Sequence, residues 1–207
     1  MTGWSATLLN LSHPPILVRE TDGQVLSMPR GTSNAGKVRE LMRFLGREAT
    51  GPGRVYLVGG ASAVIIGWRS TTVDVDLKLA PEPPGVFGAI ARAKDALDIN
   101  VELAAPDDFI PALPEWSARS VFVVRHGPVD FLHYDFYAQT LAKIERGHEQ
   151  DLRDVQAMRQ LRLIEMGRLL QLFDAIEPDL ERYPAIDPAH FRDRVRSVAE
   201  ERRAIQR

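Results

Sequence analysis

The chain has 207 residues, of which 44% are apolar and 26% charged, as in a globular protein with a sizeable core. Its net charge of −2 excludes the global basic field that drives non-specific nucleic-acid binding, although a local basic patch is still compatible with it. The absence of cysteine excludes disulfides, thiolate zinc sites and cysteine nucleophiles.

The N-terminal residues and the apolar runs indicate the cellular compartment of the protein. Residues 1–11 lack the basic region and the small-residue cleavage site of a signal peptide. No apolar run approaches the roughly 20 residues of a membrane-spanning helix. We therefore expect a cytoplasmic protein with no membrane partner.

The first predicted element is a hairpin over residues 16–28, because the Asp22-Gly23 pair tolerates the positive φ of a tight turn. A helix capped by Ser33 or Asn34 follows. Apolar runs and helical periodicity then predict a central strand at 55–58, a helix at 61–68, a strand at 71–79, a helix at 86–97, and strands at 99–103, 121–124 and 129–132.

Beyond residue 135 the pattern is helical. Helices are predicted at 137–145, 149–166, 168–176 and 188–203, with a break at Gly147. The chain is therefore predicted as α+β: a mixed β-sheet with flanking helices and the N-terminal hairpin over 1–135, followed by a helical region over 136–207.

Asp74 and Asp76 are the main candidates for chemistry. Residues two apart on a strand share a face, so both carboxylates project from the same side of the predicted sheet. Two carboxylates this close repel each other unless a cation lies between them, and Mg²⁺ prefers such hard oxygen ligands. The alternative is the solvated face of an amphipathic strand, continued by Lys78.

Gly59 and Gly60 follow the central strand and precede a helix. Such a turn can bind phosphate through backbone N–H groups, or it can be a tight turn without room for a side chain. The pair fits neither the dinucleotide fingerprint nor the P-loop, and Ser62 lacks the closing glycine of a nucleophile elbow. Ser62 is instead predicted as a phosphate donor or a first-turn residue. Arg69 is either a phosphate clamp or an exposed loop arginine.

Glu102 is the first candidate for a third carboxylate. It can join the two aspartates if its strand lies beside theirs. A site with two metal ions needs about three acidic groups, one of which can act as the general base. Asp130 and Asp135 are the rival candidates.

Lys143, Asp151 and Asp154 are the C-terminal candidates. The two aspartates are three residues apart and share a helical face, and Lys143 could neutralise triphosphate charge. Alternatively, the two aspartates only favour the start of a helix, and Lys143 is a solvated surface residue. The five histidines show no metal-ligand spacing. Trp68 and Trp116 are predicted as core or loop anchors.

These motifs together resemble the nucleotidyltransferases of the polymerase-β superfamily. The resemblance rests on Val58-Gly59-Gly60-Ala61-Ser62, on Arg69 and the Asp-x-Asp that follows it, and on Lys143 with Asp151-x-x-Asp154. More narrowly, residues 134–155 resemble the stand-alone bacterial DUF6036 group, which is related to toxins of the AbiEii type.

The resemblance implies a nucleotidyltransferase-like fold and transfer of an NMP group from an NTP to an acceptor hydroxyl on RNA, tRNA or protein. Mg²⁺ or Mn²⁺ is the implied cofactor. The site residues that the resemblance implies are Asp74 and Asp76 for the metal; Gly59, Gly60 and Ser62 for the triphosphate; Lys143 for phosphate; and Asp154, with Asp151, for the helical side of the pocket. No motif fixes the third carboxylate, for which strand alternation makes Glu102 the candidate.

The resemblance also implies the toxin of a toxin–antitoxin pair, with an antitoxin protein as partner. A catalytically inactive module that binds a nucleotide or a partner is the alternative, favoured if Glu102 faces away from the two aspartates. A metal-dependent phosphohydrolase is a third interpretation, against which the lack of clustered histidines argues.

Overall fold

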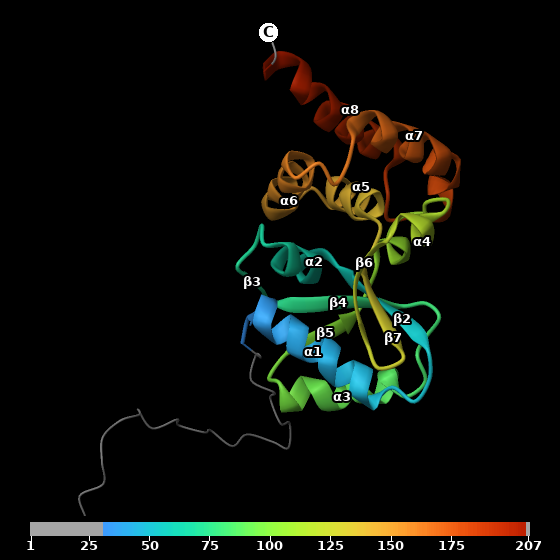
Figure 1. Ribbon diagram of the computed structural model, residues 1–207. Helices are drawn as coiled ribbons and strands as arrows, with labels where there is room; N and C mark the ends of the chain where they lie inside the picture. The colour runs from blue at the N-terminus through green and yellow to red at the C-terminus, as the bar shows by residue number, and fades with distance from the viewer. Residues whose placement is uncertain (1–30, 206–207) are drawn as a thin grey trace, which may run out of the picture.

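A five-stranded mixed sheet of strand order β5-β4-β2-β7-β6 forms the centre of the fold (Figure 1). The structure, a computed structural model, describes residues 31–205, so the hairpin predicted over 16–28 lies outside the described residues. The strands of the sheet are β2 (Gly53–Val58), β4 (Asp74–Leu79), β5 (Asn100–Leu103), β6 (Val121–His126) and β7 (Val129–His133). Two short strands, β1 (Ser33–Asn34) and β3 (Thr71–Thr72), pair separately.

Helices flank this sheet, and the predicted α+β class is confirmed. They are α1 (Ala35–Glu48), α2 (Gly59–Ile66), α3 (Val86–Ala96), α4 (Trp116–Arg119), α5 (Phe136–Arg146), α6 (Glu149–Gln160), α7 (Met166–Ile176) and α8 (Pro188–Ile205), with 3-10 turns η1 (Pro106–Asp108) and η2 (Glu177–Arg182). In the described part of the chain, none of these helices is long and apolar enough to cross a membrane.

Two predicted elements are divided in the structure. The strand predicted at 71–79 is interrupted at Val73, because β3 pairs with β1 whereas β4 pairs with β2. The helix predicted at 149–166 ends at Gln160, and Arg162 just beyond it has a φ of +57°, which a right-handed helix cannot continue through. Helix α4 was not predicted from the sequence.

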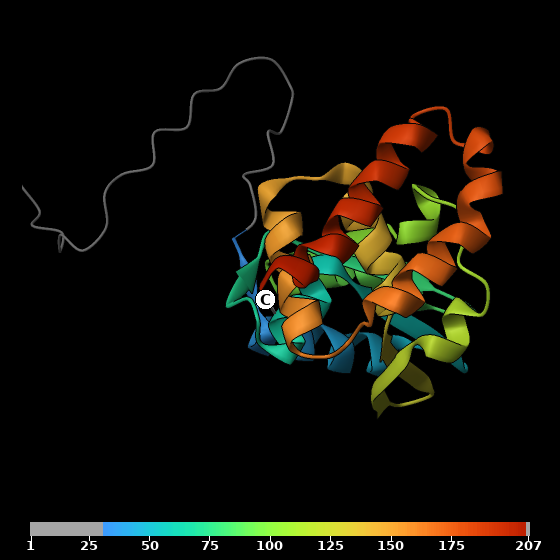
Figure 2. The same ribbon diagram turned by 90° about the horizontal axis from the view of Figure 1, so that it is seen from above.

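The central strand β2 sorts the core into two layers. Val55 and Leu57 pack with the apolar faces of α1 and α3, and Tyr56 and Val58 pack with the C-terminal helices. Figure 1 shows α1 and α3 on one side of the sheet and α5–α8 on the other, and Figure 2 shows the orange and red helices lying over the sheet.

The two aspartates of β4 face the C-terminal helices. Val58 is paired with Asp76 across the β2–β4 ladder, so Asp76 lies on the sheet face of Val58. On the opposite face, Val75 and Leu77 are buried in the core layer of α1 and α3. The predicted alternation of β4 is therefore confirmed.

The ends of the helices follow local capping rules. Asn34 caps α1, since its side chain accepts a hydrogen bond of 3.0 Å from the Lys37 N–H. Asp135 caps α5 in the same way, directly after β7. Gly147 ends α5 with a left-handed φ of +68°, as predicted from its position.

Candidate active site

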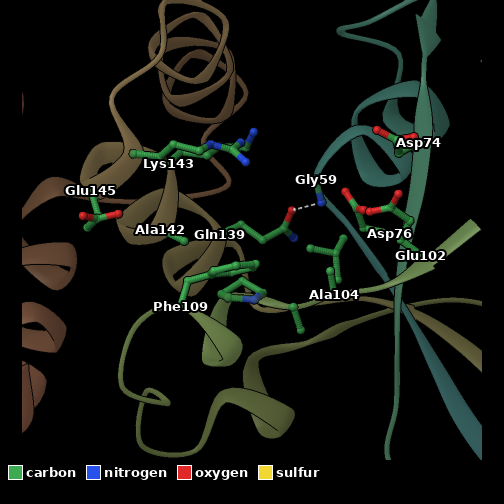
Figure 3. Close-up of a pocket in the computed structure, with 14 residues that line it drawn as sticks. Gly59, Asp74, Asp76, Glu102, Ala104, Phe109, Gln139, Ala142, Lys143 and Glu145 are labelled. Atoms are coloured by element: carbon green, nitrogen blue, oxygen red, sulfur yellow. Dashed lines mark hydrogen bonds between the residues drawn. The ribbon is translucent and has the colours of Figure 1, made fainter. Parts of the chain in front are cut away.

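A solvent-open cavity of about 300 Å³ lies between the acidic face of the sheet and α5 (Figure 3). Its lining residues are Val58, Gly59, Asp74, Asp76, Glu102, Ala104, Ala105, Pro106, Phe109, Gln139, Ala142, Lys143, Glu145 and Arg146. This volume is at the lower end of the range of about 300–1,000 Å³ for small-molecule sites.

The parallel pairing of β4 with β5 assembles the acidic wall of the cavity. Asp76 is paired with Glu102, and Asp74 with Asn100. Side chains opposite each other on neighbouring strands share a face, and Figure 3 shows the Asp76 and Glu102 carboxylates side by side, with Asp74 further along β4. The sheet thus brings Glu102 to the two aspartates.

The rival carboxylates are engaged elsewhere. Asp130 accepts hydrogen bonds from Arg125 across the β6–β7 ladder. Asp135 is buried, caps α5 and accepts hydrogen bonds from Arg119. Neither of them lines the cavity.

The acidic wall carries unbalanced negative charge. Burial, together with the neighbouring Asp74 and Glu102, raises the pKa of Asp76 from 3.8 to about 6. Lys143 and Arg146 act in the opposite direction but do not offset the rise. A cation beside Asp76 would relieve this cost.

The donor types of this wall fit a hard divalent cation, but their present arrangement does not form a metal site. Within the described residues, no three His, Cys, Asp or Glu side chains are placed so that they could hold a metal ion. The Asn100 amide donates to Asp74 and, at 3.4 Å, to Glu102, so it engages oxygens that a cation would need. A cation would therefore compete with Asn100 for one oxygen of Asp74 and one of Glu102.

The raised pKa of Asp76 makes a prediction for the metal-free protein. Between pH about 4 and 6 the Asp76 carboxyl keeps a proton in the folded chain that it has lost in the unfolded chain, so the contribution of Asp76 to stability is most favourable below that range and is lost as pH rises through 6. Asp76→Asn removes this dependence. Allowing for solvent screening, we expect the variant to gain about 1–2 kcal/mol over the wild type between pH 4 and 8.

Urea unfolding in EDTA at several pH values measures this difference. Added Mg²⁺ should stabilise the wild type more than the variant, because only the wild type keeps all the carboxylates of the wall. Parallel stability curves for the two proteins would show that the Asp76 charge costs the fold nothing.

The glycine turn lies directly beside the acidic wall. Gly59 lines the cavity at a φ of +50°, and a Cβ added there would lie 3.2 Å from an Asp76 carboxylate oxygen. Its N–H, the predicted phosphate donor, donates at 2.8 Å to the side-chain oxygen of Gln139. Gly60 is different, since a Cβ there would lie 2.0 Å from the Thr72 hydroxyl oxygen. Gly60 is therefore explained by close packing.

Ser62 lies in the core and not in the cavity. Its hydroxyl donates at 2.9 Å to the Leu57 carbonyl, and the Nδ1 atom of His133 lies 2.9 Å from the Ser62 hydroxyl oxygen. Burial lowers the pKa of His133 to about 4, so this ring is neutral near pH 7. The placement does not support the phosphate role predicted for Ser62 and favours the first-turn interpretation.

Asp154 is the centre of a buried ion cluster behind the cavity. It is 1% exposed and accepts hydrogen bonds from Trp68 at 3.1 Å, from Arg69 at 2.8 Å and from Lys143 at 2.6 Å. Burial acts to raise the pKa of Asp154, but Arg69 and Lys143 outweigh it and hold the pKa below its usual value. Arg69 is thus bound to a carboxylate and does not line the cavity.

Lys143 connects this cluster to the cavity. Its ammonium group also donates to Asp151 at 3.1 Å, and Asp151 accepts from Arg146. Both Lys143 and Arg146 line the cavity, whereas the two aspartates lie behind them. The structure therefore places Lys143 at the predicted pocket. Asp151 and Asp154 do not line the cavity but hold the cationic side chains of Lys143 and Arg146 in position.

A family model described as a nucleotidyltransferase of unknown function (DUF6036) matches residues 37–203, which include every cavity residue. The chain belongs to this family. Neither a curated protein nor a solved structure matched the chain. Membership of DUF6036 confirms the family inferred from the motifs.

Several residues that line the cavity of this DUF6036 protein were not predicted from the sequence. Gln139 and Arg146 lie four residues before and three after Lys143, so helical spacing alone put them on its face. Phe109 carried no comparable signal, because the proline-rich loop around it has no periodicity.

Proposed function

We propose that this DUF6036 protein transfers a nucleotidyl group from an NTP to an acceptor hydroxyl. The observation that carries the proposal is the β4–β5 pairing, which sets Glu102 beside Asp76 within a cavity that Gly59 also lines. Lys143 and Arg146 supply positive charge from α5 in the same cavity. Acidic and cationic groups around one opening suit a substrate that carries both phosphates and divalent cations.

The acidic wall is assigned to cation binding, with Asp74, Asp76 and Glu102 as ligands. These residues would hold Mg²⁺ or Mn²⁺, which would neutralise the triphosphate charge and activate the acceptor hydroxyl. In the transfer, the acceptor oxygen bonds to the α-phosphorus, pyrophosphate leaves, and the hydroxyl proton passes to a carboxylate of the wall.

The other side of the cavity is assigned to the triphosphate. Lys143 and Arg146 face it with positive charge held in place by Asp151. The Gly59 N–H becomes available to a phosphate oxygen once the Gln139 side chain turns away. Positioning and charge stabilisation supply most of the rate in such a site.

The proposal also covers the acceptor and the biological role. An acceptor hydroxyl of RNA, tRNA or protein can approach because the cavity is open to solvent.

The resemblance to AbiEii-type toxins supports a toxin that is neutralised by an antitoxin protein. Induced expression should then arrest growth, and Asp74→Ala should relieve the arrest. Growth arrest by Asp74→Ala equal to that by the wild type would contradict a toxin role that depends on transfer.

Transfer is tested by incubating the protein with Mg²⁺, each α-³²P-labelled NTP in turn, and either total RNA or a protein extract. We expect label to move to one acceptor class with at least one NTP. The same NTP labelled at the γ-phosphate should transfer nothing, because that phosphate leaves with pyrophosphate. Failure of every α-labelled NTP with both acceptor classes would refute the proposal.

A catalytically inactive nucleotide-binding module is the alternative. The position of Glu102 beside Asp76 argues against this alternative. The existing hydrogen bonds favour it, because a phosphate must compete with Gln139 for the Gly59 N–H and with two aspartates for Lys143. Calorimetry would then detect NTP binding with Mg²⁺ while no label moves. Release of inorganic phosphate without transfer would indicate a phosphohydrolase.

A further inference from the structure

The cavity has a third, apolar side between its acidic and cationic groups. Ala104, Ala105, Pro106 and Phe109 form it from the segment after β5, and Ala142 faces them from α5. In Figure 3 the Phe109 side chain lies below Ala142 and Gln139, on the cavity side of its loop. This side carries no charge, so it suits a part of the ligand other than the triphosphate.

The Phe109 loop is fixed at its base although Phe109 itself is exposed. The Asp108 carboxylate accepts a hydrogen bond of 2.7 Å from the Ala105 N–H, and the Phe109 N–H donates at 3.0 Å to the Pro106 carbonyl. The next residue, Ile110, is 1% exposed, whereas Phe109 is 59% exposed. The loop therefore presents a large aromatic ring to the cavity from a well-anchored position.

We propose that Phe109, with Pro106 and Ala142, forms the surface on which the base of the bound NTP stacks. This inference rests on the proposed function and adds the base site to it. A nucleotide joins a charged triphosphate to a flat aromatic base, and the cavity joins charged walls to an apolar wall with an aromatic ring. A base gains contact with such a ring whatever its sequence identity, since every base has a π-face.

The same wall determines how selective the base site is. Among the described residues on this side, the alanines, Pro106 and Phe109 have no side-chain donor or acceptor. The adjacent Gln139 uses its amide nitrogen for the Tyr134 carbonyl and, until a phosphate oxygen replaces it, its oxygen for the Gly59 N–H. Stacking without base-edge hydrogen bonds gives weak discrimination, with purines bound more tightly than pyrimidines because their rings are larger.

The test is Phe109→Ala, with calorimetric titration of ATP and of inorganic tripolyphosphate, each with Mg²⁺. We expect ATP affinity to fall about tenfold and tripolyphosphate affinity to stay unchanged, since only ATP has a base to stack. Phe109→Trp should keep ATP affinity. Phe87→Ala is the matched control, because Phe87 is 65% exposed on α3 and does not line the cavity.

A second readout follows stacking directly. The fluorescence of 2-aminopurine riboside triphosphate is quenched when its base stacks, so wild type should quench it and Phe109→Ala should quench it much less. Equal losses of ATP and tripolyphosphate affinity, or no loss of either, would overturn the base site while leaving nucleotidyl transfer intact. If the wild type binds no NTP at all, the proposed function fails and the base site with it.

Discussion

Asp76→Asn is expected to lower the rate of nucleotidyl transfer roughly a thousandfold with Mg²⁺ present. Asn keeps the size of the side chain but removes a negative charge from the wall that also holds Asp74 and Glu102. Charge stabilisation by a bound metal is worth several kcal/mol of the activation barrier. The variant loses much of this stabilisation, because the Asp76 carboxylate is one of the proposed metal ligands. Initial rates of α-³²P transfer, measured at equal enzyme concentration, give the ratio.

Two controls separate this loss from misfolding. The variant should unfold at higher urea concentration than the wild type at pH 8 in EDTA, since it lacks the costly charge of Asp76. Asp174→Asn, an exposed change on α7 away from the cavity, should keep full activity. If Asp76→Asn retains more than about a tenth of the wild-type rate, the acidic wall is not the catalytic metal site.

Asp154→Asn is expected to lower the free energy of unfolding by about 3 kcal/mol. The carboxylate is 1% exposed and receives donors from Trp68, Arg69 and Lys143. A neutral amide leaves the Arg69 and Lys143 charges with less compensation inside the fold. Such a loss is a large part of the 5–15 kcal/mol that stabilises a typical domain. Urea unfolding at pH 7 measures it.

The matched control is Asp179→Asn. Asp179 pairs with Arg182 on the surface, with side chains 49% and 79% exposed, so its loss should cost less than about 1 kcal/mol. Similar small losses for both variants would show that the buried cluster contributes no more than a surface ion pair. A transfer rate in folded Asp154→Asn equal to that of the wild type would remove the positioning role of Asp154 toward Lys143.

Local patterns in the sequence determined much of the fold. Alternation along β4 fixed the common face of Asp74 and Asp76, because strand side chains repeat every two residues whatever the strand pairs with. Capping preferences limited the start of α1 to Ser33 or Asn34, of which the structure has Asn34, and gave the end of α5 at Gly147. These features depend on neighbours within a few residues, so the chain alone specifies them.

The partners of these residues were decided by tertiary structure. Whether Glu102 or Asp130 joined the two aspartates depended on strand order, which long-range pairing sets. Burial likewise turned Ser62 into a core hydroxyl, and Arg69 found its carboxylate 85 residues away at Asp154. The sequence by itself determined which side chains could do chemistry and which face they shared; only the packed sheet and helices decided which of them meet, because contact between distant residues depends on the whole fold.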